Sequence, residues 1–285
     1  MSAPGSIRLF THRSATDTGD AVVKLLDAAH EAGVSVRAAG EEIEKHALQA
    51  DRRIASVEAD EGAGDTDVAV VLGGDGTILS ALREFARTGV PVFAFNFGAI
   101  GFLATVDEFD EGLELLLSGG YESEAMPALT ITTEAGGADA AGDVSLHRRP
   151  GLRVAELGYA VDGEPLGRVR CDGLVASTPA GSTGYNLANG GPLLAWGVEG
   201  FVISFIAPHS LTARPVVAAP DGVLTIENGS AHEAVDITTD GRPAGELEPG
   251  ERLDVRFERD VFRLALTPGS NFYHRVREKF GRIAY

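Results

Sequence analysis

The stretch that decides the fold is residues 68–77, which read VAVVLGGDGT. The apolar, largely β-branched residues 68–72 predict a buried strand, and residues 78–87 predict the helix that follows it. The connection between them is almost entirely glycine, with Asp75 at its centre. Glycines let the backbone come close to a phosphate, and the N-terminus of a helix favours its negative charge. The stretch therefore indicates a phosphoryl-transfer site, in which Asp75 accepts a proton from an attacking hydroxyl or orients a metal-bound nucleotide.

The turn differs from two common glycine-rich nucleotide-binding motifs. No Lys-Ser/Thr pair follows the glycines, so the turn is not a Walker A loop. Ile78 and Leu79 occupy positions where the third glycine of Gly-x-Gly-x-x-Gly could fall, so a dinucleotide-binding fingerprint fits poorly. Gly and Asp are also ordinary turn residues, and a simple strand-to-helix connection stays open at this point.

Strands and helices alternate in the first part of the chain. We expect strands at residues 7–11, 34–36, 68–72 and 91–97, and helices at residues 17–30, 41–57 and 78–87. This alternation predicts an open parallel α/β domain, Rossmann-like, over residues 1–106. Ligands bind at the carboxyl ends of the strands in such sheets, which is where the glycine turn lies.

The pattern changes after residue 106. A helix is expected over residues 108–117, capped by Asp107 and ended by Gly119-Gly120. Short strands with turns between them follow, and they predict a mostly antiparallel β-sandwich domain over residues 107–270. These strands are expected at residues 129–133, 152–161, 166–170, 201–206, 223–227, 233–238, 252–258 and 262–266. Residues 135–150 are predicted to be an exposed loop, and the tail 271–285 to contain a short helix that packs back on the N-terminal domain.

Composition limits the partners and the compartment. The formal net charge is −18, with the acidic residues spread along the chain, and such a surface repels nucleic acid and anionic membranes. Such an acidic surface suits a cytosol so salty that charges are screened within about 3 Å. We therefore make the hypothesis that the protein is salt-adapted. One cysteine, Cys171, excludes an internal disulfide and favours a reducing cytoplasm. No apolar run is long enough to cross a bilayer, and the histidines and the cysteine show no metal-ligand spacing.

A second group of candidate residues lies in residues 170–186, which read RCDGLVASTPAGSTGYN. The predicted strand here ends in a dense cluster of hydroxyls and glycines. Hydroxyls and exposed amides can bind ribose hydroxyls or phosphate oxygens, and Tyr185 could stack on a planar base. The alternative is a simple cap, with Ser182 or Thr183 at the start of a short helix.

Taken together, these motifs resemble those of the NAD kinase family. The resemblance runs from about residue 60 to the C-terminus, in the order in which the family carries its motifs. It rests on residues 73–77, 96–103 (NFGAIGFL), 172–185, 189–192 (NGGP), 208–211 (PHSL), 214–215 (RP) and 271–273 (NFY). Gly-Gly-Asp-Gly also occurs in diacylglycerol-type lipid kinases and phosphofructokinases, which are similar in this half. Residues 178–185 distinguish the NAD kinases from them.

The resemblance implies transfer of the ATP γ-phosphate to the 2′-hydroxyl of the adenosine ribose of NAD, which gives NADP. Asp75 would then be the proton acceptor, and Gly73, Gly74, Gly76 and Thr77 would hold phosphates. Mg²⁺ would bridge the ATP phosphates, as in phosphoryl transfer generally. The resemblance also implies a homodimer or homotetramer assembled through the β domain.

The family also implies an acceptor pocket for NAD. Asp172 would face the nicotinamide end, and Ser182, Thr183 and Tyr185 would hold the adenosine, with Arg170 beside them. The remaining residues implied to bind the substrate are Glu156, Thr178, Asp240 and Arg242.

The chain departs from the family pattern mainly in this pocket. Ala155 stands where the family has Asn, Ala180 where it has a hydroxyl residue, Gly184 where it has Ala, and Arg242 where it has Gln. Because a lost hydrogen bond costs only about 1 kcal/mol, NAD could still bind. The identity of the phosphoryl acceptor stays open. One alternative is a kinase of the same fold that acts on another small hydroxylated molecule, such as a sugar phosphate. The other is a non-catalytic nucleotide-binding sensor, against which the intact Asp75 argues.

Overall fold

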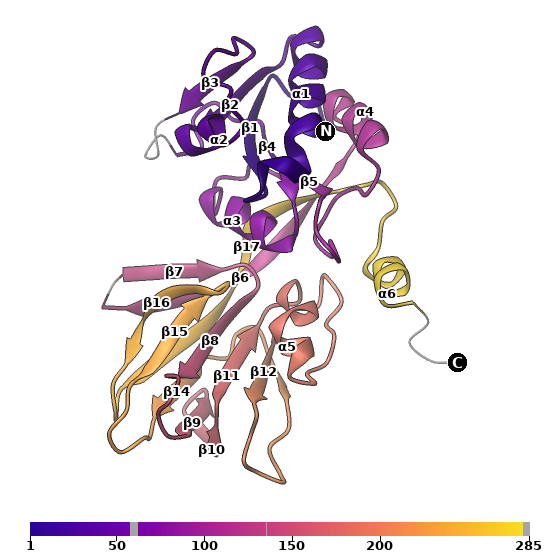
Figure 1. Cartoon of the computed structure of the whole chain (residues 1–285). Coiled ribbons are helices and arrows are strands. Elements are labelled where there is room, and N and C mark those ends of the chain that lie inside the picture. The colour runs from indigo at the N-terminus through magenta and orange to yellow at the C-terminus, as the bar shows by residue number, and fades with distance from the viewer. Residues whose placement is uncertain (58–61, 135, 282–285) are drawn as a thin grey trace. The chain divides into compact units, whose positions relative to one another are not determined.

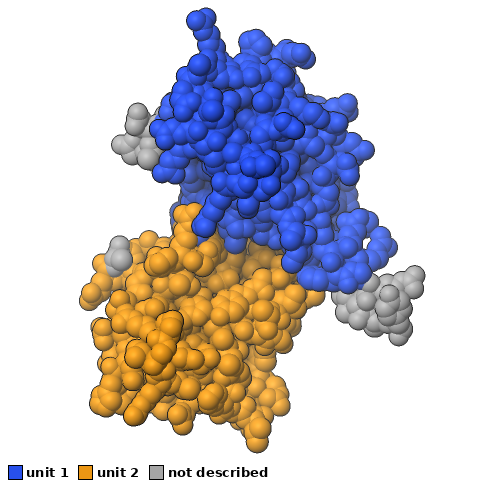
Figure 2. Space-filling view, viewed as in Figure 1, with its two compact units in different colours: residues 1–125, 261–285 blue, residues 126–260 orange. Residues whose placement is uncertain are grey.

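The chain forms two compact units (Figures 1 and 2). The computed structural model describes residues 1–57, 62–134 and 136–281; residue 135 and residues 282–285 of the predicted loop and tail lie outside this part. Unit 1 comprises residues 1–125 and 261–285, and unit 2 comprises residues 126–260. The first unit thus extends past residue 106, because helix α4 (Phe109–Ser118) contributes Leu116 to its core, and the end of the chain returns to it.

Unit 1 contains a parallel sheet of the predicted class. Its strands lie in the order β5-β4-β1-β2-β3, and all four of these pairings are parallel. The strands are β1 (Ser6–Thr11), β2 (Ser35–Ala39), β3 (Ile54–Val57), β4 (Val68–Gly73) and β5 (Val92–Asn96). The other helices of the unit are α1 (Ala15–Glu31), α2 (Gly40–Lys45), α3 (Asp75–Glu84) and α6 (Phe272–Phe280). This part of the predicted fold class is confirmed.

The sheet has a switch point between β1 and β4. Strands β2 and β3 extend the sheet on the β1 side, whereas β5 extends it on the β4 side. Crevices at such reversals, outside the carboxyl ends of the strands, are where open α/β sheets bind ligands. Strand β4 is buried along its whole length and ends at Gly73, so the glycine turn emerges at this point.

Three local predictions in unit 1 were wrong. Residues 41–57 do not form one helix, because α2 ends at Lys45, Ala47 has a φ of +53°, and β3 follows. Helix α3 begins at Asp75 and ends at Glu84, so it does not reach residue 87. The N-cap of α4 is Glu108, not Asp107, whereas Gly119 ends that helix in the left-handed conformation as predicted.

Unit 2 is the predicted antiparallel sandwich. One sheet has the order β13-β12-β11-β8-β15-β16, and the other contains β10-β9-β14 with the first part of β17. Side chains of both sheets, such as Leu146 and Phe201 from one and Leu157 and Val255 from the other, form one core. The strands that lie wholly or partly in this unit are β6 (Glu122–Thr133), β7 (Gly136–Ala140), β8 (Asp143–Arg148), β9 (Ala155–Val161), β10 (Glu164–Cys171), β11 (Gly173–Ser177), β12 (Phe201–Ile206), β13 (Val216–Ala218), β14 (Leu224–Asn228), β15 (Val235–Thr239), β16 (Arg242–Leu247) and β17 (Arg252–Leu266).

Two further predictions for this region are corrected. Most of the predicted loop 135–150 is strand β7 and strand β8, and β8 lies in the middle of its sheet between β11 and β15. Val144 and Leu146 alternate along β8 and are fully buried, which is the strand signal in this stretch. Residues 252–258 and 262–266 form the single strand β17, whose last part pairs with β5 in parallel. No helix in the described ranges combines the length and apolar character needed to cross a membrane.

Candidate functional site

One side of the glycine turn, at Gly74, is held by close backbone packing that leaves no room for a side chain. Gly74 is the N-cap of α3, and its carbonyl accepts from Thr77 N and Ile78 N at 2.9 and 3.1 Å. A Cβ at Gly98, in the loop after β5, would lie 2.7 Å from the Cα of Gly74. At Gly76, by contrast, an added Cβ would meet nothing within 4 Å, and the residue is exposed. The turn is thus rigid on one side and open on the other.

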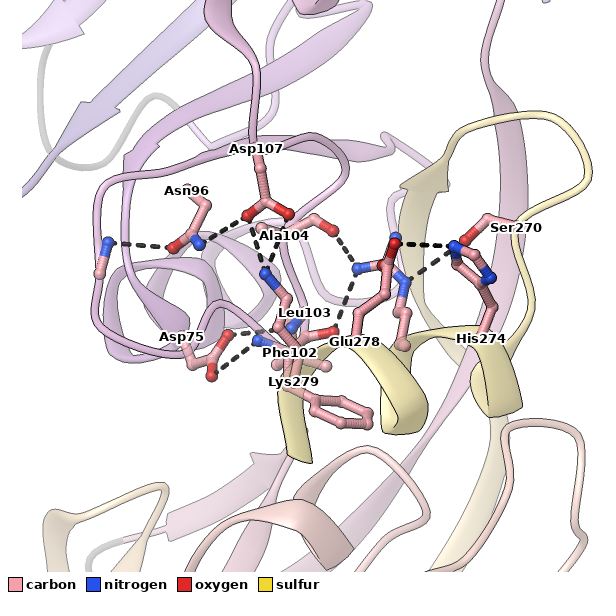
Figure 3. A network of polar contacts seen from close by, with 12 residues as sticks. Asp75, Asn96, Phe102, Leu103, Ala104, Asp107, Ser270, His274, Glu278 and Lys279 are labelled. Carbon is pink, nitrogen blue, oxygen red and sulfur yellow. Dashed lines mark hydrogen bonds and ion pairs between the residues drawn. The ribbon is translucent and has the colours of Figure 1, made fainter. Parts of the chain in front are cut away.

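Asp75 is the first residue of α3, and backbone groups hold its carboxylate. The two oxygens accept from Phe102 N at 3.1 Å and from Leu103 N at 2.9 Å (Figure 3). The N-terminus of a helix also favours a negative charge at this position. The carboxylate is therefore fixed in place as a hydrogen-bond acceptor.

The loop that supplies these amides is folded around Asn96, at the end of β5. Its side chain accepts from Gly98 N at 3.0 Å and donates to Asp107 Oδ1 at 2.7 Å. Gly101 has a φ of +66°, and a Cβ there would lie 2.2 Å from the Asn96 side chain. This packing explains why residues 96–103 carry an asparagine and two glycines at these positions.

In unit 2, the hydroxyls of two predicted substrate-binding residues form hydrogen bonds to the protein's own backbone. Thr178 Oγ1 donates to Ala141 O at 2.6 Å and accepts from Gly181 N at 3.1 Å. Ser182 Oγ donates to Pro179 O at 2.7 Å and accepts from Leu194 N at 2.9 Å. Both side chains are fully buried, and their hydrogen bonds fix the conformation of the loop after β11.

Thr183 and Tyr185 remain partly accessible at the end of this loop. Thr183 Oγ1 donates to Ala180 O at 3.2 Å, and neither Ser182 nor Thr183 caps the short helix α5 (Tyr185–Ala188). The Tyr185 ring stacks on His147 of β8, with centroids 5.6 Å apart and an angle of 12° between the planes. Tyr185 is therefore a half-buried aromatic platform.

A pair of carboxyl groups lies beside the buried Thr178. Asp240 accepts from the backbone N–H groups of Ala141, Gly142 and Asp143 at 2.7 to 3.1 Å. Burial, together with the neighbouring Asp240, raises the pKa of the Asp143 carboxyl to about 7. Asp143 and His147, both on β8, were missed from the sequence because their segment was predicted to be a loop.

The other predicted residues lie in different surroundings. Asp172 pairs with Arg148 Nε, and that hydrogen bond lowers the pKa of the Asp172 carboxyl. Glu156 and Arg170 are opposite each other on β9 and β10, and the Glu156 carboxylate pairs with Arg168 Nη1 at 3.4 Å. Arg242 is exposed at the start of β16. The structure thus brings Thr178, Ser182, Thr183, Tyr185 and Asp240 around β8 and the loop after β11, but it does not bring Glu156 into this group.

In the described part of the chain, no group of three or more His, Cys, Asp or Glu residues is placed to hold a metal ion.

Comparison with known proteins identifies the family. Residues 10–121 match the family model described as the ATP-NAD kinase N-terminal domain, and residues 141–265 match the ATP-NAD kinase C-terminal domain. The chain belongs to the ATP-NAD kinase family. The NAD kinase of Geotalea daltonii is 36% identical over 220 residues, which are 75% of this chain and 78% of that protein. The NAD kinase of Ralstonia nicotianae is 37% identical over 227 residues, 77% of this chain and 75% of that protein.

Two solved structures share the fold of this chain. Yeast NADH kinase complexed with NADH superposes with a TM-score of 0.87 at 24% identity, over 100% of this chain and 90% of that one. An NAD kinase from Archaeoglobus fulgidus in complex with ATP superposes with a TM-score of 0.74 at 22% identity, over 97% of each chain. At this identity the likeness speaks for the fold, and the family matches carry the membership.

Proposed function

We propose that this chain is an ATP-dependent NAD kinase, which transfers the γ-phosphate of ATP to the 2′-hydroxyl of the adenosine ribose of NAD. The observation that carries the proposal is the fixed Asp75 carboxylate beside an open glycine turn, in a chain of the ATP-NAD kinase family. A general base must be positioned before it can act, and two backbone N–H groups position this one.

The turn is assigned to the phosphoryl donor. Gly73, Gly74, Gly76 and Thr77 place backbone groups at the N-terminus of α3, where partial positive charge favours phosphate oxygens. Phosphoryl transfer depends mostly on positioning and on stabilising charge. Mg²⁺ bound with ATP would neutralise part of that charge, and we expect it to be held mainly by the phosphates themselves.

Asp75 is assigned as the proton acceptor for the ribose hydroxyl. An ionised carboxylate has about four acceptor positions. The amides of Phe102 and Leu103 occupy one on each oxygen, which leaves the others free for the hydroxyl proton. Because the amides keep the carboxylate from rotating, the hydroxyl oxygen and the γ-phosphate can be aligned.

The acceptor residues are assigned from their accessibility. Tyr185 would stack on the adenine, Thr183 and Asp240 would bind the ribose side, and Asp172 would face the nicotinamide. The buried hydroxyls of Thr178 and Ser182 would shape the loop. Direct contacts of Glu156, Arg170 and Arg242 with NAD stay predictions, as do the cytoplasmic location and the homodimer or homotetramer.

A substrate panel tests the proposal. Purified protein in high KCl with Mg-ATP is incubated with NAD, NADH or sugar phosphates, and ADP release is measured together with chromatographic identification of the phosphorylated product. We expect ADP and NADP in equal amounts with NAD. ADP release with a sugar phosphate and none with either nicotinamide nucleotide would contradict the proposal and restore the alternative acceptor. Binding of nucleotides without turnover would favour the sensor.

A further inference from the structure

The C-terminal helix α6 is attached to the loop that holds Asp75. The helix and the loop both belong to unit 1, although more than 160 residues separate them, as the hydrogen bond from Arg275 to Ala104 spans 171 positions. Asn271 caps α6 by accepting from His274 N at 2.9 Å. Figure 3 shows Lys279 of α6 reaching Asp107 of the loop. Helix α6 is therefore a structural part of the Asp75 site.

Arg275 makes the innermost of these contacts. Its Nη1 donates to Phe102 O at 3.2 Å and to Ala104 O, and the residue is 6% exposed. Burial lowers the pKa of the Arg275 guanidinium, and the carboxylates of Asp107, Glu278 and Asp75 oppose that effect. A buried cation is costly unless its donors are satisfied, and here the Phe102 and Ala104 carbonyls of the loop accept from Nη1, while Ser270 Oγ accepts from Nε.

Ring packing and an ion pair hold the same loop. The Phe102 ring packs on Phe272 at 5.7 Å and on Phe280 at 5.6 Å between centroids. Lys279 Nζ binds both oxygens of Asp107, at 2.8 and 2.9 Å, and Asp107 in turn accepts from Asn96. Arg275 differs from these because it binds the carbonyl of Phe102, the residue whose N–H binds Asp75.

We propose that Arg275 is a positioning residue for the phosphoryl transfer: its guanidinium holds the carbonyls of Phe102 and Ala104, and so aims the N–H groups of Phe102 and Leu103 at the Asp75 carboxylate. The inference rests on the proposed role of Asp75. It assigns α6 a task beyond packing, because the helix fixes the direction in which the base points.

The expected effect follows from the geometry. A displacement of about 1 Å at a reacting group can lower the rate on the order of 10²-fold. Without the guanidinium, the Phe102 and Ala104 carbonyls lose their buried donor and the loop can turn. Since Arg275 acts on the base and not on a ligand, we expect kcat to fall and the KM values for ATP and NAD to change little.

The test compares Arg275→Met and Arg275→Ala with Arg277→Ala, an exposed arginine on the same helix. We expect kcat to fall about 10²-fold in both Arg275 variants and to stay near the wild-type value in Arg277→Ala. Added guanidinium, below the concentration that unfolds the protein, should restore part of the kcat of Arg275→Ala. Arg275→Lys should retain more activity than Arg275→Met, because it keeps a donor.

Hydrogen exchange gives a readout that needs no activity. The N–H groups of Phe102 and Leu103 should exchange faster in Arg275→Met than in the wild type, with the rest of unit 1 unchanged. An unchanged kcat, a rise in KM alone, or unchanged exchange of these amides would overturn the inference. If the wild-type protein does not phosphorylate NAD, the proposed function fails, and the exchange experiment still decides whether Arg275 holds the loop.

Discussion

The glycine turn of unit 1 and the hydroxyl-rich segment of unit 2 carry the two proposed halves of the chemistry in different ways. The turn is built from backbone contacts. Close packing between Gly74 and Gly98 excludes side chains there, and two backbone N–H groups bind the Asp75 carboxylate. In the segment, the most conspicuous hydroxyls, those of Thr178 and Ser182, are buried and used internally. A backbone site can thus be recognised within a few consecutive residues, whereas a side-chain site depends on what other strands bring to it.

The largest effect is expected from Asp75→Asn. The amide cannot take the proton, and its NH₂ group faces an N–H donor where a carboxylate oxygen accepted one. Loss of a general base typically costs about 10²- to 10⁴-fold, so we expect kcat to fall by that factor. Steady-state assays of NADP formation measure it, with the exposed Asp110→Asn as the matched control. Full activity in Asp75→Asn would remove the base from the proposed mechanism.

Tyr185→Ala tests the acceptor side of the comparison. Stacking of a base on an aromatic ring is worth about 1 to 3 kcal/mol, so the KM for NAD should rise roughly 10-fold or more while the KM for ATP stays unchanged. Tyr185→Phe keeps the ring and should behave like the wild type. If both variants bind NAD normally by titration calorimetry, the adenine does not stack on Tyr185.

A pair of glycine variants separates packing from phosphate binding. Gly98→Ala places a Cβ against the Cα of Gly74, and we expect it to lower the free energy of unfolding by about 1 to 3 kcal/mol. Gly76→Ala has open space around its Cβ, so its stability should be unchanged while the new methyl group raises the KM for ATP. Denaturant unfolding and kinetics measure the two effects. Equal stability of the two variants would contradict the packing argument.

The smallest effect is expected from Asp143→Asn, and it depends on pH. Because the folded-state pKa of Asp143 is raised to about 7, the folded protein binds more protons than the unfolded chain between about pH 4 and pH 7. The wild type therefore loses stability as pH rises through this window, and the asparagine variant does not. We expect the variant to gain on the order of 1 kcal/mol relative to wild type on going from pH 6 to pH 7. Thermal unfolding at both pH values measures the gain. An equal difference in stability between the variant and the wild type at both pH values would contradict the buried pair.

Much of the fold and half of the candidate site could be predicted from the sequence. The strand 68–72 and the turn after it were readable because β-branched runs and glycines act locally. The loop prediction for residues 135–150 failed because their Gly, Ala and Asp content outweighed the alternation of Val144 and Leu146, and Asp143 and His147 were lost with it. The helix predicted over residues 41–57 failed because helix-forming composition continued across Ala47, where the backbone turns.

The sequence by itself determined the α/β and β-sandwich classes, the glycine turn and the family, because each depends on periodicity or on consecutive residues. Only the tertiary structure decided which of the candidate groups are buried, which stay accessible and which contact one another. It buried Thr178 and Ser182, brought Asp143 beside Asp240, and set Arg275 on the carbonyl of Phe102. Those outcomes depend on contacts between residues that are distant in the chain, and such contacts are fixed by packing and by the need to satisfy buried polar groups.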